Sequence, residues 1–394
     1  MNAPILLEEA WARLFALVQP IGTETIPVDE PAGRYLAEPL IARRTQPYAD
    51  LSVMDGFAVS GRGPWSLIGE SRAGAPFARP LAAGEAVRIS TGAACPTGTT
   101  GIVVREEACV EGARLTGTLP EAGRWVRRRG FDFSEGTPLV AAGSAIGPAQ
   151  IALARAGGHG MVEVSQRPLV AVIECGDELV SDPAACPAGR LPASNGAMVA
   201  AMMQSVGAQA CRGAPLPDDR AALARTIREA ADADVIVTTA GASIGEHDHV
   251  RGALEDCGAD LAFWRVAIRP GKPLLVAQLG KQLVLGLPGN PSSSFVTAFL
   301  FLLPLLRALQ GAAKPLPVPI PLRLANALDA GGERREFLRA RFVDGHAAPL
   351  SERDSSALRI LAAAELLVDR PIDAAAAAAG TAVPCYWLRN GGIA

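Results

Sequence analysis

Lysine and aromatic residues are scarce in this chain of 394 residues. Almost all of the basic side chains are arginine, and only Lys272, Lys281 and Lys314 are lysine. A lysine within a motif therefore stands out from its background. Aromatic residues make up 5% of the chain although hydrophobic residues make up 49%, so the cores must be built largely from alanine, valine, leucine and isoleucine.

Paired cysteines and a secretory signal are also missing. The seven cysteines are scattered, odd in number and without a CxxC pair, which argues against a disulfide framework and against a zinc knuckle. The N-terminus has neither the basic region nor the long apolar region of a signal peptide. The predicted location is therefore a reducing cytoplasm.

No strong charge imbalance and no long apolar run occur. The 37 basic and 40 acidic residues give a net charge of -3, so nothing global favours nucleic acid or an anionic membrane as a partner. The most apolar segment, residues 295–306, is too short to cross a bilayer and contains Pro304. It predicts a buried helix. Any anionic ligand must be held by local groups.

The length exceeds what one hydrophobic core usually organises, and it predicts roughly two to four domains. Residues 5–18 have helical periodicity, whereas residues 45–134 contain short strand-like runs broken by glycine and proline. This middle segment predicts a small, mostly β domain inserted into the chain. We expect residues 137–158 to return to helix and to pack with the N-terminal helix.

Strand-like and helical patterns alternate from residue 168 to residue 310. Such alternation predicts a doubly wound, largely parallel sheet. The expected strands are residues 168–174, 234–239 and 282–287. The expected helices are residues 194–206, 249–258 and 291–309, together with a helix that begins after a cap at Asp218 or Asp219 and ends at residue 231. Residues 318–394 again predict short strands, as a C-terminal β domain.

In a parallel sheet, ligands bind beyond the carboxyl ends of the strands, and three candidate segments are expected there. Small residues at 240–245 let backbone N–H groups approach an anion, although glycine-rich turns are also a common packing solution. The sequence IRPGKPLL fixes Arg269 and Lys272 on a rigid turn, which favours an anion over bulk water. Three serines at 292–294 open the long helix, where hydroxyl and N–H groups serve an anion as well as a cap.

Carboxylates near these loops indicate a hard cation, because Mg²⁺ binds one or two carboxylates together with phosphate oxygens. Asp248, with Asp218 or Asp219, is the best pair for this role. The run His247, Asp248 and His249 fits zinc less well, since successive side chains diverge and helical ligands need a spacing near i, i+4.

Taken together, these segments resemble the molybdopterin molybdenumtransferase family, the molybdenum-insertion enzymes that include the E domain of gephyrin. The order and spacing of the motifs carry the resemblance, which spans SVMDGFAV, RISTGAACPTGTTGIVVREE, VRRRGFDFSEG, GDELV, FWRVAIRPGKPL, GLPGNPSSS and RREFLRARF. Such enzymes bind adenylylated molybdopterin and molybdate as substrates, and release AMP and molybdenum cofactor with the help of Mg²⁺.

The resemblance implies an α/β multidomain fold and a homodimer whose sites lie where domains of the two subunits face one another. Its parts are a split N-terminal domain (residues 1–44 and 135–166), the inserted β domain (45–134), a molybdopterin-binding doubly wound α/β domain (167–313) and a C-terminal β domain (314–394). Whether the chain also contacts the adenylyltransferase that supplies such a substrate is left open.

Residue roles follow from the same resemblance. The oxyanion pocket is expected at Ser243, Lys272, Pro273, Ser293, Arg339 and Ser355, and the Mg²⁺ site at Asp218 and Asp248. Asp55, Asp132, Glu178, Asp248 and Lys272 are the expected catalytic residues. The other expected substrate-binding residues are Thr91, Asp177, Gly241, Gly245, Arg265, Arg269, Pro288, Asn290 and Pro291, with Asp55, Thr91 and Asp132 facing the partner's site.

Some positions depart from the family pattern. Glu174 and Cys175 replace a small serine-threonine pair and add a carboxylate near the pterin site, and Asp354 places a negative charge beside Ser355. His249 stands where an aromatic hydroxyl is usual. These changes leave two alternatives to the transferase: a non-catalytic scaffold or storage protein that binds molybdopterin, and a paralogue that handles tungstate.

Overall fold

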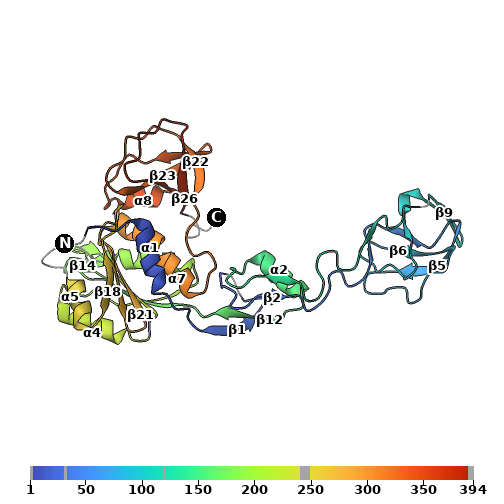
Figure 1. Cartoon of the computed structure of the whole chain (residues 1–394), viewed down its shortest axis with the longest axis horizontal. Coiled ribbons are helices and arrows are strands. Elements are labelled where there is room, and N and C mark those ends of the chain that lie inside the picture. The colour runs from blue at the N-terminus through green and yellow to red at the C-terminus, as the bar shows by residue number, and fades with distance from the viewer. Residues whose placement is uncertain (1–2, 31–32, 119, 240–248, 389–394) are drawn as a thin grey trace.

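The computed structural model describes residues 3–30, 33–118, 120–239 and 249–388. Figure 1 shows an elongated molecule, with the α/β domain and the C-terminal β domain stacked at one end and the inserted β domain at the other. A small domain that contains α2 lies between them. The multidomain α/β fold predicted from the sequence is confirmed.

The α/β domain is built on one mixed sheet with the strand order β16-β13-β17-β21-β20-β18. Its parallel strands are β13 (Leu169–Ile173), β16 (Gln209–Arg212), β17 (Val235–Thr239) and β21 (Gln282–Leu287), and its antiparallel strands are β18 (Asp260–Trp264) and β20 (Leu275–Leu279). The three strands expected from the sequence are the centre of this sheet. A short pair, β14 (Leu179–Val180) and β15 (Leu191–Pro192), lies outside it, with the 3₁₀ turn η2 (Pro183–Ala185) between them.

Helices cover both faces of the sheet because alternate strand residues point to opposite sides. Val235 and Val237 of β17 face the core that contains α3 (Asn195–Gln204). Ile236 faces the other core, which contains α4 (Arg220–Glu229) and α5 (His249–Asp256). Asp219 caps α4 by accepting a hydrogen bond from the Ala222 N–H, which is one of the two caps expected.

The long apolar helix runs from Pro291 to Leu309 as α6 (Pro291–Thr297), a π-helical segment η3 (Ala298–Leu302) and α7 (Leu303–Leu309). Among the described residues it is the one helix long and apolar enough to span a membrane, and 89% of its apolar window is buried inside the protein. The prediction of a buried helix is confirmed, and the helix has the expected bounds, residues 291–309. Pro304 lies at the start of α7, after the π-helical segment.

The N-terminal helix α1 (Leu7–Ala16) packs where it was not expected. Its buried residues Leu7, Ala10 and Leu14 join the core of the α/β domain, against β18 and α7. The expectation that it packs with residues 137–158 is wrong. That segment forms β11 (Pro138–Val140) and α2 (Pro148–Ala156), which belong to the core of the small middle domain.

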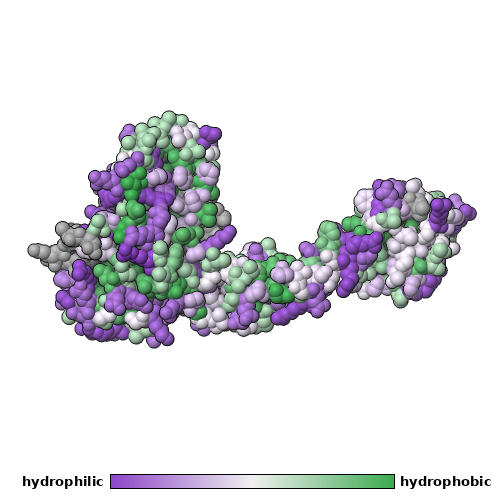
Figure 2. All heavy atoms as spheres, in the orientation of Figure 1, coloured by the Kyte–Doolittle hydropathy of each residue, from purple (hydrophilic) through white to green (hydrophobic). Residues whose placement is uncertain are grey.

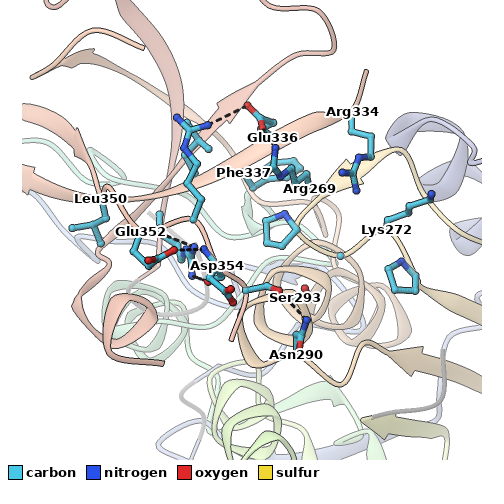
Figure 3. Close-up of a pocket in the computed structure, with 17 residues that line it drawn as sticks. Arg269, Lys272, Asn290, Ser293, Arg334, Glu336, Phe337, Leu350, Glu352 and Asp354 are labelled. Atoms are coloured by element: carbon cyan, nitrogen blue, oxygen red, sulfur yellow. Dashed lines mark hydrogen bonds and ion pairs between the residues drawn. The ribbon is translucent and has the colours of Figure 1, made fainter. Parts of the chain in front are cut away.

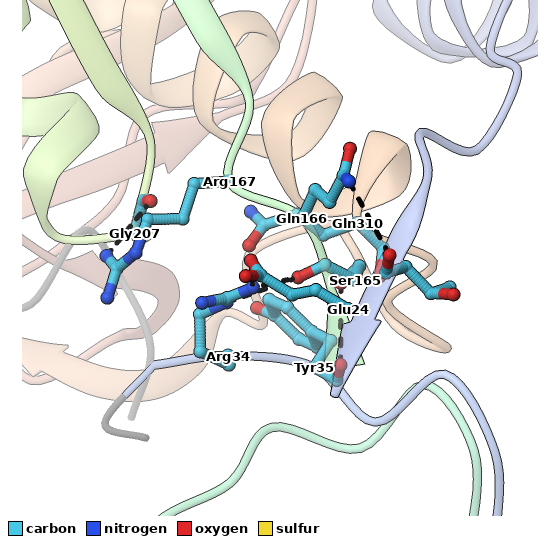
Figure 4. A network of polar contacts seen from close by, with 9 residues as sticks. Glu24, Arg34, Tyr35, Ser165, Gln166, Arg167, Gly207 and Gln310 are labelled. Carbon is cyan, nitrogen blue, oxygen red and sulfur yellow. Dashed lines mark hydrogen bonds and ion pairs between the residues drawn. The ribbon is translucent and has the colours of Figure 1, made fainter. Parts of the chain in front are cut away.

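The middle domain joins the α/β domain through a buried polar network (Figure 4). The domain is formed by β1 (Thr23–Pro27) with β12 (Met161–Ser165), and by β2 (Leu40–Ile41) with β11. The Arg34 guanidinium, 4% exposed, donates to the Ser165 carbonyl and pairs with Glu24. Ser165 Oγ in turn donates to the carbonyl of Gln310, 2.8 Å away, at the end of α7. Because Arg34, Ser165 and Gln310 are buried and bonded, the network fixes the joint between the two domains.

The two β domains complete the chain. The inserted domain is built on one sheet with the strand order β7-β4-β6-β5-β9-β8. Its strands are β4 (Gly56–Val59), β5 (Trp65–Ser71), β6 (Glu85–Ile89), β7 (Gly101–Val104), β8 (Ala108–Glu111) and β9 (Arg114–Gly117). A separate pair, β3 (Leu51–Ser52) with β10 (Val126–Arg127), and the 3₁₀ turn η1 (Arg105–Glu107) complete the domain. The sheet of the C-terminal domain has the strand order β19-β23-β24-β22-β26-β25, and pairing of β23 with β25 closes it. The elements of this domain are β22 (Ile320–Leu324), β23 (Arg335–Val343), β24 (His346–Pro349), α8 (Leu358–Ala363), β25 (Leu366–Arg370) and β26 (Ala382–Trp387).

One strand of this closed sheet, β19 (Ile268–Arg269), comes from the α/β domain and pairs in parallel with β23. The basic turn that follows Arg269 is therefore held at the junction of the two domains. Figure 2 shows hydrophilic surface where these two domains meet.

Candidate functional site

A cavity of about 420 Å³ lies at this junction, and we call it the basic cavity. The basic turn, the start of α6, β23 and the loop before α8 contribute its walls (Figure 3). Five of its lining residues are cationic, namely Arg269, Lys272, Arg334, Arg339 and Arg353, and three are acidic, namely Glu336, Glu352 and Asp354. Pro273, Asn290, Ser293 and Ser355, all expected from the sequence, line it as well.

Gly271 lets the basic turn approach α6. Its φ of +103° is one that side-chain-bearing residues rarely adopt. A Cβ atom there would also lie 2.6 Å from Cγ2 of Thr297. The Val266 N–H donates to the Lys272 carbonyl at 3.0 Å and closes the turn. Lys272 is thus carried by a rigid backbone.

Arg339 organises the opposite wall. Its side chain is 5% exposed and donates to Ser292 Oγ (2.7 Å) and to the carbonyls of Asp354 (2.9 Å) and Glu352 (3.0 Å). Burial lowers the pKa of Arg339, but an arginine remains charged at neutral pH. One guanidinium therefore joins the helix start to the loop at 352–354.

The loop also docks directly on the start of α6. Asn290 Nδ2 donates to Ser355 Oγ at 2.9 Å, and the Ser292 N–H donates to the Ser355 carbonyl at 2.9 Å. These bonds bring Ser293 and Ser355, which lie far apart in the sequence, to one cavity.

The negative charge expected beside Ser355 is present and compensated. Asp354 Oδ1 accepts hydrogen bonds from the N–H (2.8 Å) and hydroxyl (2.7 Å) of Ser356. These bonds lower the pKa of Asp354, so it is ionised at neutral pH. An anion bound in the basic cavity would lie near this carboxylate.

Glu336 neutralises part of the positive charge of the basic cavity. Its carboxylate lies 3.2 Å from Arg269 Nη1 and 4.0 Å from Arg353 Nη1. Within the described part of the chain, Lys272 and Arg334 line the same cavity without an ion-pair partner. These two cations are available to an anionic ligand.

A second cavity of about 740 Å³ adjoins the basic cavity and shares Pro273, Asn290 and Ser293 with it. Its other lining residues include the expected Glu178, Pro288 and Pro291, together with Glu174, Cys175, Leu179, Leu191, Pro192, Asn195, Thr239 and Leu358. Proline and leucine side chains give it partly apolar walls. Two ligand groups bound in the two cavities would lie side by side.

The carboxylate of Glu174 lines the second cavity and has its own partners. Glu174 Oε1 accepts from the Gly196 N–H at 2.8 Å, and Oε2 pairs with Arg212 at 3.2 Å. Burial raises the pKa of the neighbouring Cys175 to about 12, so its thiol is neutral. The charge added by this departure from the family pattern is therefore neutralised by Arg212.

Asp177 and Asp218 face each other at the edge of the sheet. Asp177 Oδ1 accepts from the Asp218 N–H at 3.2 Å, and Asp218 Oδ2 accepts from the Asp177 N–H at 3.3 Å. Each carboxylate retains one oxygen for which the described residues supply no hydrogen-bond donor. Within those residues no group of three or more potential metal ligands occurs, and the expected partner Asp248 lies outside them.

Comparison with known proteins identifies the family. Residues 5–158 match the MoeA N-terminal region (domain I and II), residues 171–308 a probable molybdopterin binding domain, and residues 321–388 the MoeA C-terminal region (domain IV). A molybdopterin molybdenumtransferase of a Nostoc species is 34% identical over 332 residues, covering 80% of this chain and 76% of that protein. The chain belongs to the molybdopterin molybdenumtransferase family. It is thus a transferase of molybdenum cofactor biosynthesis.

Two further relatives extend the match over almost the whole chain. Molybdopterin molybdenumtransferase 2 of Mycobacterium tuberculosis is 32% identical over 385 residues and covers 92% of this chain and 95% of its own length. The crystal structure of a molybdopterin biosynthesis protein from Pyrococcus horikoshii superposes with a TM-score of 0.82 at 27% identity, covering 98% of this chain and 99% of that one. The resemblance read from the motifs is confirmed.

Several expected site residues lie away from the two cavities. Arg265 is 8% exposed and stacks on Trp264, with its guanidinium carbon 4.4 Å from the ring centre, and it lines neither cavity. That Arg265 binds substrate stays a prediction of the family resemblance. Gly241, Ser243, Gly245 and Asp248 fall in residues 240–248, outside the described residues.

Asp55, Thr91 and Asp132 belong to the inserted β domain, which Figure 1 shows apart from the α/β domain. Asp55 Oδ1 accepts from the N–H (2.7 Å) and hydroxyl (3.0 Å) of Thr91, and these bonds lower the pKa of Asp55. Within one chain this pair is remote from both cavities. That it faces a partner's site stays a prediction of the family resemblance.

The sequence did not single out several lining residues. Arg334 and Glu336 stand in the quoted RREFLRARF, but nothing local indicates that β23 meets the basic turn. Glu352 and Arg353 lie in a polar loop with no motif of its own, and they line the basic cavity only because Arg339 anchors that loop.

Proposed function

We propose that the chain inserts molybdenum from molybdate into adenylylated molybdopterin and releases AMP. The observation that carries this proposal is the basic cavity, where Lys272 and Arg339 lie with serine hydroxyls beside a larger cavity that has partly apolar walls. Molybdate is a tetrahedral dianion, which binds cations and hydroxyl donors in preference to carboxylates. The shared residues Pro273, Asn290 and Ser293 would hold it next to the organic substrate.

The chain's own groups act by positioning and electrostatics. Lys272 and Arg334 neutralise charge on the oxyanion, and Ser293 supplies a hydroxyl donor. A water molecule or a molybdate oxygen attacks phosphorus and forms a new phosphorus–oxygen bond, while one phosphorus–oxygen bond of the phosphoanhydride breaks and AMP is released. Fixed donors stabilise the charge that develops in such a step without needing to reorganise.

Asp218 and Asp177 fit a magnesium ion, because each has a carboxylate oxygen to offer and Mg²⁺ typically takes one or two carboxylates plus phosphate oxygens and water. Asp248 would be a further ligand. When bound there, Mg²⁺ would neutralise charge on the phosphoanhydride.

The chain would act as a homodimer, in which Asp55, Thr91 and Asp132 of one subunit approach the cavities of its partner. The separation of the inserted β domain from the cavities of its own chain supports this arrangement.

The decisive experiment supplies purified protein with adenylylated molybdopterin, molybdate and Mg²⁺. We expect AMP release and formation of cofactor that activates a molybdenum-free apoenzyme, and we expect chelation of Mg²⁺ to stop AMP release. Binding of the substrate without AMP release would instead support a scaffold. Greater activity with tungstate than with molybdate would support the paralogue.

Lys272→Ala should raise the molybdate concentration needed for half-maximal AMP release by about 10- to 100-fold, since a charge-assisted hydrogen bond contributes roughly 1.5–3 kcal/mol. Lys281→Ala is the matched control, because Lys281 lies in the turn between β20 and β21 and lines neither cavity. An unchanged molybdate dependence in Lys272→Ala would remove this residue from the pocket.

A further inference from the structure

The N-terminal segment that precedes α1 lies against the chain that leads into the basic turn. The Ile5 N–H donates to the Arg265 carbonyl at 3.2 Å, and the Ile5 carbonyl accepts from the Ala267 N–H at 2.8 Å. Ile5 thereby forms a parallel bridge with Val266, which is fully buried in the core that also contains Leu7. A segment remote in the sequence is therefore bonded to the backbone from which β19 begins.

Arg265 is the residue that this contact supports. Its φ of +78° lies in the left-handed region, which a residue with a side chain adopts only where the surrounding structure holds it. The Arg265 N–H donates to the Leu274 carbonyl at 3.0 Å, and the Arg265 carbonyl is the acceptor for Ile5. Hydrogen bonds on both of its sides thus hold the segment 265–274, which carries Arg269 and Lys272.

Glu8, in the first turn of α1, contacts the C-terminal domain. Its carboxylate lies 2.5 Å from Arg335 Nη1. Arg335 also donates two hydrogen bonds, of 2.7 and 2.6 Å, to Asp369, which is 2% exposed. Arg335 stands between Arg334 and Glu336, which both line the basic cavity, whereas Arg335 does not. The pair with Glu8 therefore ties the start of β23 to the N-terminal helix at a residue next to the cavity wall.

We propose that residues 5–8 form a clasp that positions the two walls of the basic cavity, an inference that rests on the proposed function. Ile5 holds the backbone that carries Lys272, and Glu8 holds the strand next to Arg334. Ile5 and Glu8 line neither of the two cavities, so both act as positioning residues.

The clasp matters because the two cations available to an anion come from different domains. Lys272 belongs to the α/β domain and Arg334 to the C-terminal domain, and both line the basic cavity (Figure 3). Attraction between an oxyanion and a cation falls with distance, and a hydrogen bond weakens when its geometry is lost. Loosening the clasp should therefore weaken oxyanion binding without removing any group that touches the oxyanion.

The first test removes one hydrogen bond and measures molybdate binding by equilibrium dialysis. Ile5→Pro deletes the N–H that donates to Arg265, whereas Ile5→Ala shortens the side chain and keeps this N–H. Leu6→Pro is the matched control, because Leu6 is exposed, has a φ of -68° that suits proline, and donates no N–H hydrogen bond within the described part of the chain. Ile5→Pro should weaken molybdate binding about tenfold, and the other two variants should stay within about twofold of the wild type.

The second test removes the ion pair. Glu8→Gln should weaken molybdate binding about two- to fivefold, since an exposed ion pair contributes little, and high salt should shrink its difference from the wild type. Glu9→Gln is the matched control, because Glu9 pairs with Arg13 within α1, and it should bind molybdate as the wild type does. Glu8 is exposed, so Glu8→Gln should fold normally and tests the clasp whatever Ile5→Pro does to folding.

Steady-state AMP release separates positioning from stability. A partly unfolded variant has fewer active molecules, so its kcat falls while its KM for molybdate stays the same. The clasp predicts the opposite, a higher KM with kcat within about twofold of the wild type. Hydrogen–deuterium exchange at residues 265–274 should also be faster in Ile5→Pro than in Leu6→Pro.

Two results would overturn the clasp. They are molybdate affinities that do not differ between each variant and its control, and a loss of kcat with an unchanged KM for molybdate. Wild-type protein whose molybdate binding depends on Ile5 and Glu8 but which releases no AMP would contradict the transferase reaction alone. Wild-type protein that binds no molybdate would contradict both proposals.

Discussion

Replacing Arg339 by alanine should lower kcat/KM for molybdate-dependent AMP release by about two to three orders of magnitude. The guanidinium makes three hydrogen bonds, two of them to the carbonyls of Glu352 and Asp354. Hydrogen bonds to a charged group contribute roughly 1.5–3 kcal/mol each. Their loss releases the loop that carries Ser355 and removes a cation from the basic cavity.

Arg339→Lys separates the two effects. Lysine keeps the charge, but its ammonium cannot reproduce the planar fork that reaches Ser292 and both carbonyls. We therefore expect an intermediate loss of activity, with the molybdate requirement less affected than in Arg339→Ala. Circular dichroism and the Tm monitor folding. Full activity of Arg339→Ala in folded protein would contradict the role assigned to this residue.

The central strands of the α/β sheet could be predicted from the sequence because each is a short apolar run followed by a helical pattern. The antiparallel strands β18, at one edge of the sheet, and β20, next to it, were missed, since they follow the helix α5 and the basic turn without a distinct period. The packing of α1 was predicted wrongly for a related reason. Periodicity shows that Leu7, Ala10 and Leu14 share one apolar face, but it does not say which core receives that face.

In the candidate site, too, some features could be predicted from local sequence signals and others depend on contacts between distant segments. Lys272 and Ser293 could be found because a rigid turn and a helix start are local signals. The sequence paired Asp218 or Asp219 with Asp248, which lies outside the described residues. The structure adds that Asp218 lies beside Asp177, through reciprocal hydrogen bonds between two loops.

The close contact between Gly196 and Glu174 leads to the second large prediction, a destabilisation of roughly 1–3 kcal/mol by Gly196→Ala. A Cβ atom at this position would lie 2.3 Å from Glu174 Oε2. The carboxylate cannot swing away freely, because Glu174 is 5% exposed and bonded at both oxygens. Crowding and a weakened hydrogen bond together outweigh the gain of up to about 1 kcal/mol that alanine brings to a helix.

Gly252→Ala in α5 is the matched control. The atoms that a Cβ would meet there belong to the half-exposed side chain of Arg220, which can move. Its effect should lie within about 0.5 kcal/mol of zero or be stabilising.

A double mutant then tests the cause. In Glu174→Ser the space beside Gly196 is open, and the partly exposed Arg212 regains water. Adding Gly196→Ala to Glu174→Ser should therefore cost nothing or stabilise the protein, while the same change costs roughly 1–3 kcal/mol in the wild type. Urea denaturation of the four variants measures this coupling. Equal costs in both backgrounds would show that Glu174 does not require glycine at residue 196. Unequal costs would mean that a serine at residue 174 permits a side chain at residue 196, whereas the buried glutamate excludes one.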